Sequence, residues 1–175
     1  MPSSQPASGD AKLGVAGEDE QQQYLTFSLG EEMFAIGILA IREIIGYGYL
    51  TTVPMTPPFI RGVINLRGAV VPVVDLAARF GRTSTEVSKR TSIVVVETNT
   101  DQGHLVIGAV VDAVSEVLEI HARDIEPPPL LGNHIRGDFI AGMGKVNGRF
   151  VVVLDVDRVL SPGEIAVSAW AERAS

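Results

Sequence analysis

Apolar and polar residues alternate with a period of two in residues 23–29, Gln-Tyr-Leu-Thr-Phe-Ser-Leu. Such alternation is typical of a strand with one buried face. Other short apolar segments recur between turn residues, and they predict strands at 33–36, 63–66, 69–74, 92–98, 104–111, 144–146 and 149–154. Residues 38–45 fit a helical turn followed by a strand about as well as one bent strand.

Turn residues punctuate the whole chain. Asn147-Gly148 is a strong hairpin signal, because both residues tolerate positive φ, and Arg67-Gly68 and residues 99–103 connect other predicted strands. The 175 residues include 23 valines and 14 isoleucines, whose stiff, branched side chains favour a pleated surface. Many short strands separated by turns predict an all-β fold of the barrel or sandwich type.

The two ends of the chain differ from this pattern. Residues 1–22 lack aromatic side chains and are rich in Ser, Gly, Gln and acids, so we predict a disordered acidic tail. Residues 161–164, Ser-Pro-Gly-Glu, form a capping box that predicts a C-terminal helix within 161–175, holding Trp170. Residues 23–160 remain as one domain, with approximate subdomains 23–85 and 90–160.

A weak internal repeat relates these two subdomains. Four landmarks of the first half, at residues 36–37, 43–45, 60–62 and 73–76, recur in order at 107–108, 116–118, 135–137 and 153–156. Each is common in a chain rich in Val and Ile, so coincidence and true repetition are about equally favoured. A true repeat implies two small barrels packed together. We expect their shared core to include Ile64, Val73, Val110 and Val153.

The charge balance excludes some classes of partner. Fourteen Lys plus Arg against 21 Asp plus Glu give a formal charge of −7, which repels nucleic acid and acidic membrane surfaces. We therefore expect no nucleic acid and no direct membrane contact. The absence of cysteine excludes disulfides and thiolate chemistry. No signal peptide or long apolar span is recognisable, so we expect a cytoplasmic protein.

No catalytic or metal-binding pattern is recognisable. The three histidines are 17 and 13 residues apart in sequence, far from metal-ligand spacing, and residues 142–145 depart from the Walker pattern. Asp75, Asp112 and Asp155 each follow an apolar strand, where an aspartate usually caps a turn. We therefore expect no enzyme, no catalytic residue, no cofactor and no metal.

Glu43 and Arg67 are charged residues in otherwise apolar segments. Such residues form either a structural ion pair or an anchor for a partner. The planar guanidinium of arginine suits both roles, because it binds carboxylates through two parallel hydrogen bonds.

Residues 61–68, Arg-Gly-Val-Ile-Asn-Leu-Arg-Gly, and the following 71–76 and 80–81 resemble the signature of the CheW-type chemotaxis coupling proteins. Other family landmarks follow in order at 27–30, 34–36, 42–44, 108–112 and 154–155, so the resemblance covers roughly residues 23–160. It implies two SH3-like five-stranded β-barrels packed on a shared hydrophobic core, with short helical segments. A chain of this length resembles the stand-alone adaptor of the family.

The resemblance also implies partners. Family members bridge the cytoplasmic tip of methyl-accepting chemoreceptors to the regulatory domain of a CheA-type histidine kinase, as monomers that can join larger arrays. By position, the receptor-facing residues are Ile41, Glu43, Asn65, Arg67, Gly108 and Val117. Gly62 and Gly68 correspond to the kinase-binding end.

Three alternatives remain open at this point. A structural homo-oligomer could close the exposed barrel edges, and a scaffold could serve a chemotaxis-like pathway that controls pili or second messengers. An enzyme of unrecognised type is the third.

Overall fold

The computed structural model describes residues 21–48, 50–100, 103–127 and 137–161. The predicted C-terminal helix and residues 1–20 of the predicted tail lie outside this range. The strands are β1 (Gln21–Leu29), β2 (Glu32–Gly37), β3 (Ile41–Gly46), β4 (Ile60–Leu66), β5 (Ala69–Asp75), β6 (Ser92–Thr100), β7 (Gly103–Val111), β8 (Ala113–His121), β9 (Ile125–Glu126), β10 (Ile140–Val146) and β11 (Arg149–Leu154). The helices are η1 (Ile38–Ala40), α2 (Leu76–Arg79), η2 (Ala122–Asp124), η3 (Gly137–Phe139) and α3 (Val156–Val159).

Two observations adjust the predicted boundaries at the start of the chain. Gln21 and Gln22 pair with His121 and Ile120 of β8, so order begins before residue 23. Residues 38–45 form a helical turn, η1, followed by strand β3, which is one of the two readings that the sequence left open.

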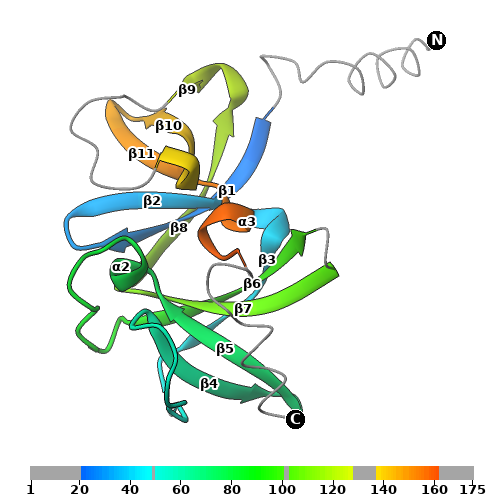
Figure 1. Ribbon diagram of the computed structural model, residues 1–175. Helices are drawn as coiled ribbons and strands as arrows, with labels where there is room; N and C mark the ends of the chain where they lie inside the picture. The colour runs from blue at the N-terminus through cyan, green and yellow to red at the C-terminus, as the bar shows by residue number, and fades with distance from the viewer. Residues whose placement is uncertain (1–20, 49, 101–102, 128–136, 162–175) are drawn as a thin grey trace.

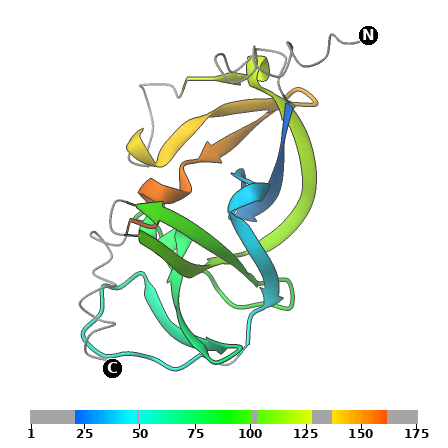
Figure 2. The same cartoon turned by 90° about the vertical axis from the view of Figure 1, so that its right-hand side faces the viewer.

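The strands form two sheets, each curled into an SH3-like barrel (Figure 1). The upper barrel has the strand order β8-β1-β2-β11-β10-β9, in which β9 is only two residues long. The lower barrel has the order β3-β6-β7-β5-β4. Figure 2 shows β8, in yellow-green, rising from the lower barrel along the side of the molecule to the upper one.

The internal repeat is present in the structure. β2 pairs in parallel with β11, and β7 pairs in parallel with β5. After β5 and β11, Asp75 and Asp155 each accept a hydrogen bond from a backbone N–H three residues ahead and begin a short helix. The backbone N–H groups of the same two residues donate to the carbonyls of Phe59 and Phe139, at 2.7 and 2.8 Å. Residues 135–136, part of one landmark, lie outside the described range.

The boundary expected near residues 85–90 does not divide the strands between the barrels. The upper barrel takes β1 and β2 from the first half and β8 to β11 from the second, while the lower barrel takes β3 to β5 and β6 to β7. Each half therefore contributes a hairpin to the barrel that the other half completes. The pattern along the chain predicts strands, but the two parallel pairings decide which barrel a strand joins.

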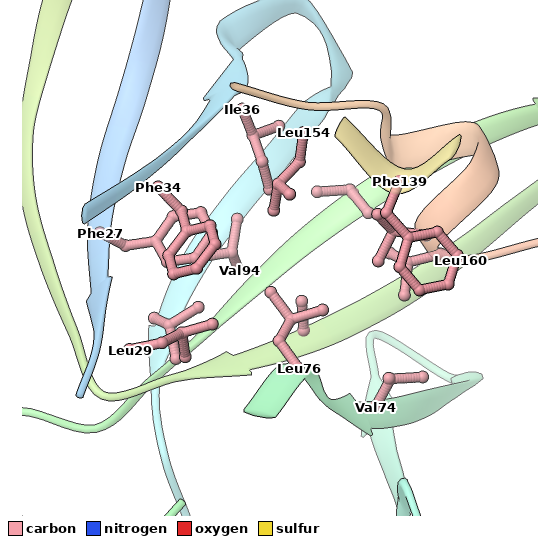
Figure 3. Packing of buried hydrophobic residues seen from close by; sticks show 14 of the residues in the cluster. Phe27, Leu29, Phe34, Ile36, Val74, Leu76, Val94, Phe139, Leu154 and Leu160 are labelled. Carbon is pink, nitrogen blue, oxygen red and sulfur yellow. The ribbon is translucent and has the colours of Figure 1, made fainter. Parts of the chain in front are cut away.

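A shared core lies between the barrels and is built from both (Figure 3). The rings of Phe27, Phe34, Phe80 and Phe139 form a row, with successive centroids 6.0, 5.6 and 6.0 Å apart. Aliphatic side chains of both barrels surround this row, among them Leu25, Leu29, Ile36, Val152 and Leu154 of the upper barrel and Val74, Val94, Val96, Ile107, Ala109 and Val111 of the lower.

The residues expected in the shared core occupy different places, so that prediction was wrong. Val73 and Val110 fill the interior of the lower barrel, and Ile64 packs against them. Val153 lies in the interior of the upper barrel. The sequence neighbours of the three valines face the shared core instead, because successive side chains of a strand point to opposite faces. Residues 71–76 are all buried, so no polar alternation marks the faces.

A core that both barrels share should make them unfold together. Phe34→Ala is expected to lower the free energy of unfolding by about 3–5 kcal/mol, because it removes a buried ring and leaves a cavity. Urea denaturation should show one transition, with the same midpoint by circular dichroism and by hydrogen exchange in either barrel. The exposed Val87→Ala serves as the control, with a change within about 0.5 kcal/mol. Two resolved transitions, or a folded fragment of residues 1–85, would contradict the shared core.

Candidate partner-binding surface

The turn of the β4–β5 hairpin holds an arginine in an unusual backbone conformation. Arg67 and Gly68 have φ values of 54° and 88°, and the Asn65 side-chain oxygen accepts a hydrogen bond from the Gly68 N–H at 2.9 Å. The equivalent turn of the β10–β11 hairpin has Asn147 and Gly148, at 52° and 78°. Asparagine tolerates positive φ far better than arginine does. A bulky residue in this backbone conformation indicates a role beyond the turn itself.

Arg67 forms a two-bond ion pair with Glu43 of β3. Its Nη2 donates to Oε1 of Glu43 at 3.1 Å, and its Nη1 donates to Oε2. The Arg67 side chain is 75% exposed and that of Glu43 is 25% exposed. The hydrogen bond from Arg67 holds the pKa of Glu43 below its usual value, and the same bond raises the pKa of Arg67. Both groups therefore stay charged near neutral pH.

A bulge in β3 places two charged residues side by side. In the pairing of β3 with β6, Ile41 lies opposite Val96 and Glu43 lies opposite Val95. Arg42, between them, is the extra residue at this shift in register. A bulge redirects side chains relative to a regular strand. Arg42 and Glu43 both line the same groove as a result.

This groove, of about 260 Å³, runs over the lower barrel beside the hairpin turn. Arg67, the exposed Val70 and part of β7 complete its walls. A second hollow adjoins it and is lined by Leu39 of η1, which is 97% exposed, and by the start of α3. His104 lines both hollows. Sequence reasoning did not single out Leu39 or His104, although a helical turn followed by a strand was one of the two readings of residues 38–45.

The structure brings together only some of the residues expected at the receptor-facing surface. Glu43, Asn65 and Arg67 meet at the hairpin turn. Ile41 is half-buried at the start of β3, and its side chain packs against the shared core. Val117 is 49% exposed, but it lies on β8 in the upper barrel.

Gly108 is buried in β7 between Val73 and Val95, which pair with it from either side. A Cβ added there would lie 2.7 Å from the Ile93 Cγ2. Gly108 thus makes room for packing inside the lower barrel. Because it is buried, it cannot itself form part of a contact surface as expected from its position in the family pattern.

The two glycines expected at the kinase-binding end lie in different environments. Gly62 is buried in β4 at a φ of +153°, and a Cβ there would be 2.4 Å from the Thr51 carbonyl oxygen. Thr51 exchanges two backbone hydrogen bonds with Val63, of 3.0 and 2.8 Å. Gly62 therefore allows the segment around Thr51 to pair with the edge of β4. Gly68 is exposed in the turn beyond the other end of β4, so the two glycines do not form one contact surface.

Two further residues of the 61–76 segment form a buried ion pair. Arg61 Nε donates to Oδ2 of Asp75 at 2.9 Å, and the Thr85 N–H donates to the same oxygen at 3.0 Å. Arg61 Nη1 also donates to the Tyr47 hydroxyl at 3.1 Å. Asp75 is fully buried, so removal of Arg61 would leave its carboxylate without a compensating charge. This pair ties together β4, the start of α2 and the segment that follows.

Two statements hold for residues 21–48, 50–100, 103–127 and 137–161. No helix there is both long and apolar enough to span a membrane. Within the same range, three or more His, Asp or Glu side chains do not gather in a way that could hold a metal ion.

Comparison with known proteins identifies the family. The model of the CheW-like domain matches residues 23–164. The chain belongs to the CheW-like family. Chemotaxis protein CheW of Klebsiella aerogenes is 37% identical over 153 residues, covering 87% of this chain and 90% of the relative. Chemotaxis protein CheW of Rhizobium meliloti is 36% identical, covering 82% and 90%.

A solved CheW structure has the same architecture. The scaffolding protein TtCheW from Thermoanaerobacter tengcongensis superimposes with a TM-score of 0.73 at 34% identity, covering 81% of this chain and 89% of that one. The two SH3-like barrels are therefore the fold of a CheW-like protein.

The burial of Gly62 leads to a stability prediction for this CheW-like protein. Gly62→Ala is expected to lower the free energy of unfolding by about 2–4 kcal/mol, because the new methyl group meets a backbone carbonyl and φ is unfavourable. Gly37→Ala is the matched control: no atom lies near its added Cβ, and a change within about 1 kcal/mol is expected. Urea titration of both variants measures the difference. Equal stabilities of the two variants would show that the segment around Thr51 moves away from the new methyl group at no cost in folding free energy.

The ion pair leads to a prediction for titration. A carboxyl whose pKa is lowered on folding favours the folded state above its unfolded pKa, near 4.3, and this contribution disappears as pH falls through the lower folded value. NMR titration should therefore place the Glu43 pKa below that of an unpaired glutamate. In Arg67→Asn, the Glu43 pKa should return toward its usual value. An unchanged Glu43 pKa in that variant would rule out the pair as its cause.

Proposed function

We propose that this CheW-like protein is a non-enzymatic chemotaxis adaptor. It couples the cytoplasmic tip of methyl-accepting chemoreceptors to the regulatory domain of a CheA-type histidine kinase, and it acts at the cytoplasmic face of the membrane through the receptors. The names of its relatives and of its structural neighbour, a scaffolding protein, support an adaptor role. The observation that carries the proposal is the exposed Arg67, fixed by Glu43 at the edge of a groove.

Arg67 is better explained as an anchor for a partner than as a scaffold residue. A surface ion pair contributes only about 0–1 kcal/mol to stability, and asparagine would suit the turn better. The pair with Glu43 uses two of the five guanidinium N–H donors. The other donors are free to bind a partner, and Glu43 limits the orientations of the side chain.

The groove and the hollow that adjoins it also offer apolar contacts. Val70 is 58% exposed beside the turn, and Leu39 is almost fully exposed in the adjoining hollow. An amphipathic helix binds such a surface by placing apolar side chains into the hollows, while charged contacts set its register. A helical receptor tip matches this description.

We place the kinase contact on the edge of the lower barrel formed by β4 and the segment around Thr51. β3 and β4 are the two edge strands of that sheet, and Thr51 forms an isolated bridge with Val63 of β4. The parts of such an edge that have no partner can pair with a similar barrel. Met55, in the same connection, is 87% exposed at a φ of 64°. Gly62 would then affect kinase binding by positioning this segment, and Gly68 would lie at the border between the two contacts.

Arg67→Asn tests the receptor contact without disturbing the turn. Asn147 occupies the equivalent turn position, so the variant should keep its stability within about 1 kcal/mol of the wild type. It should lose receptor-dependent activation of the kinase in a reconstituted phosphorylation assay. Binding to the isolated kinase should persist, because the edge of β4 is unchanged. Arg67→His is expected to give the same result.

Asn147→Asp provides the control for a changed residue at a hairpin turn, since it alters the corresponding position of the other barrel. It should leave receptor coupling intact. If a folded Arg67→Asn protein still couples the receptor to the kinase, Arg67 belongs to the scaffold and the receptor contact lies elsewhere. If kinase binding is lost together with coupling, both partners share the hairpin turn.

A further inference from the structure

The charged side chains of the groove and of the adjoining hollow differ in exposure. Glu43 and Glu97 are 25% and 31% exposed, whereas Arg42, Arg67 and His104 are 56%, 75% and 72% exposed. Arg42 Nη1 donates to Oε1 of Glu97 at 2.9 Å, and His104 Nδ1 lies 3.2 Å from Oε2 of the same carboxylate. The two guanidinium groups and the His104 ring are therefore more exposed than the two carboxylates, and we call these three groups the rim.

Both carboxylates already have partners on each oxygen. Glu43 binds the two terminal nitrogens of Arg67, and Glu97 meets Arg42 on one oxygen and His104 on the other. A partner that approaches the groove thus meets guanidinium N–H groups first. The rim offers hydrogen-bond donors with positive charge on a chain whose formal charge is −7.

We infer that this rim selects a partner helix through acidic side chains, placed between apolar ones that contact Val70 and Leu39. The inference rests on the proposed function, because it describes the receptor segment that the groove would bind. Asp157 limits where the acidic side chains of the partner can lie, because like charges repel. It lines the hollow that His104 also lines, and its carboxylate accepts a hydrogen bond from the Asn99 N–H at 3.0 Å. The acidic side chains of the partner therefore face Arg42 and Arg67.

Two substitutions with opposite expected effects test the acidic partner. The probe is a soluble cytoplasmic fragment of a methyl-accepting chemoreceptor from the same organism, titrated calorimetrically into the full-length protein. Glu97→Gln should lower the dissociation constant about two- to fivefold, because it removes a negative charge next to the rim. Arg42→Gln should raise it by a similar factor. Both effects should shrink at high salt.

Glu119→Gln is the matched control, since it makes the same change of charge on an exposed position of β8 in the upper barrel. It should leave the dissociation constant unchanged. Weaker binding by Glu97→Gln, or equal effects of Glu97→Gln and Glu119→Gln, would overturn the inference while leaving the proposed function in place. A wild-type protein that binds no receptor fragment would overturn the proposed function itself, and the inference with it.

Discussion

The packing of the two barrels against one another is the constraint on which the rest of the structure depends. The row of rings from Phe27 to Phe139 crosses from the upper barrel through Phe80 at the end of α2 and back to η3. Arg79 lies between the rings of Phe59 and Phe139, 4.9 and 4.7 Å from their centroids, and its Nε donates to the Val159 carbonyl. The short helices are thereby attached to the same core, and each barrel supplies the surface that the other needs to bury its apolar face.

The exchange of hairpins between the two halves strengthens this arrangement. The chain passes from the upper barrel to the lower one at η1 and returns at Asp112, so neither barrel is complete without both halves. The passage at η1 also exposes Leu39, beside the groove that holds Arg67. The proposed receptor contact therefore extends from the lower barrel to the hollow between η1 and α3, where the barrels join. An adaptor that transmits a signal between two partners benefits from such rigidity.

The candidate site was predictable from the sequence in part. Glu43, Asn65 and Arg67 could be connected through the resemblance, and the structure places them together at one turn. The role of the glycines could not be inferred, because a glycine in a motif fits a contact surface as well as a tightly packed interior. Gly62 and Gly108 are buried, and the added-Cβ distances of 2.4 and 2.7 Å show what they accommodate. Arg42, Glu97 and His104 come from three different strands, β3, β6 and β7, and only their pairing brings these residues into contact.

The sequence by itself determined the all-β class, most of the strands, the hairpin turns and the family. These depend on local pattern: side-chain alternation, residues that tolerate positive φ, and a motif of adjacent residues. Only the tertiary structure decided which strands share a barrel and which face of each strand meets the shared core. Those choices depend on contacts between residues far apart in the chain. Where both faces of a strand are buried, as in residues 71–76, the sequence shows no polar side to distinguish them.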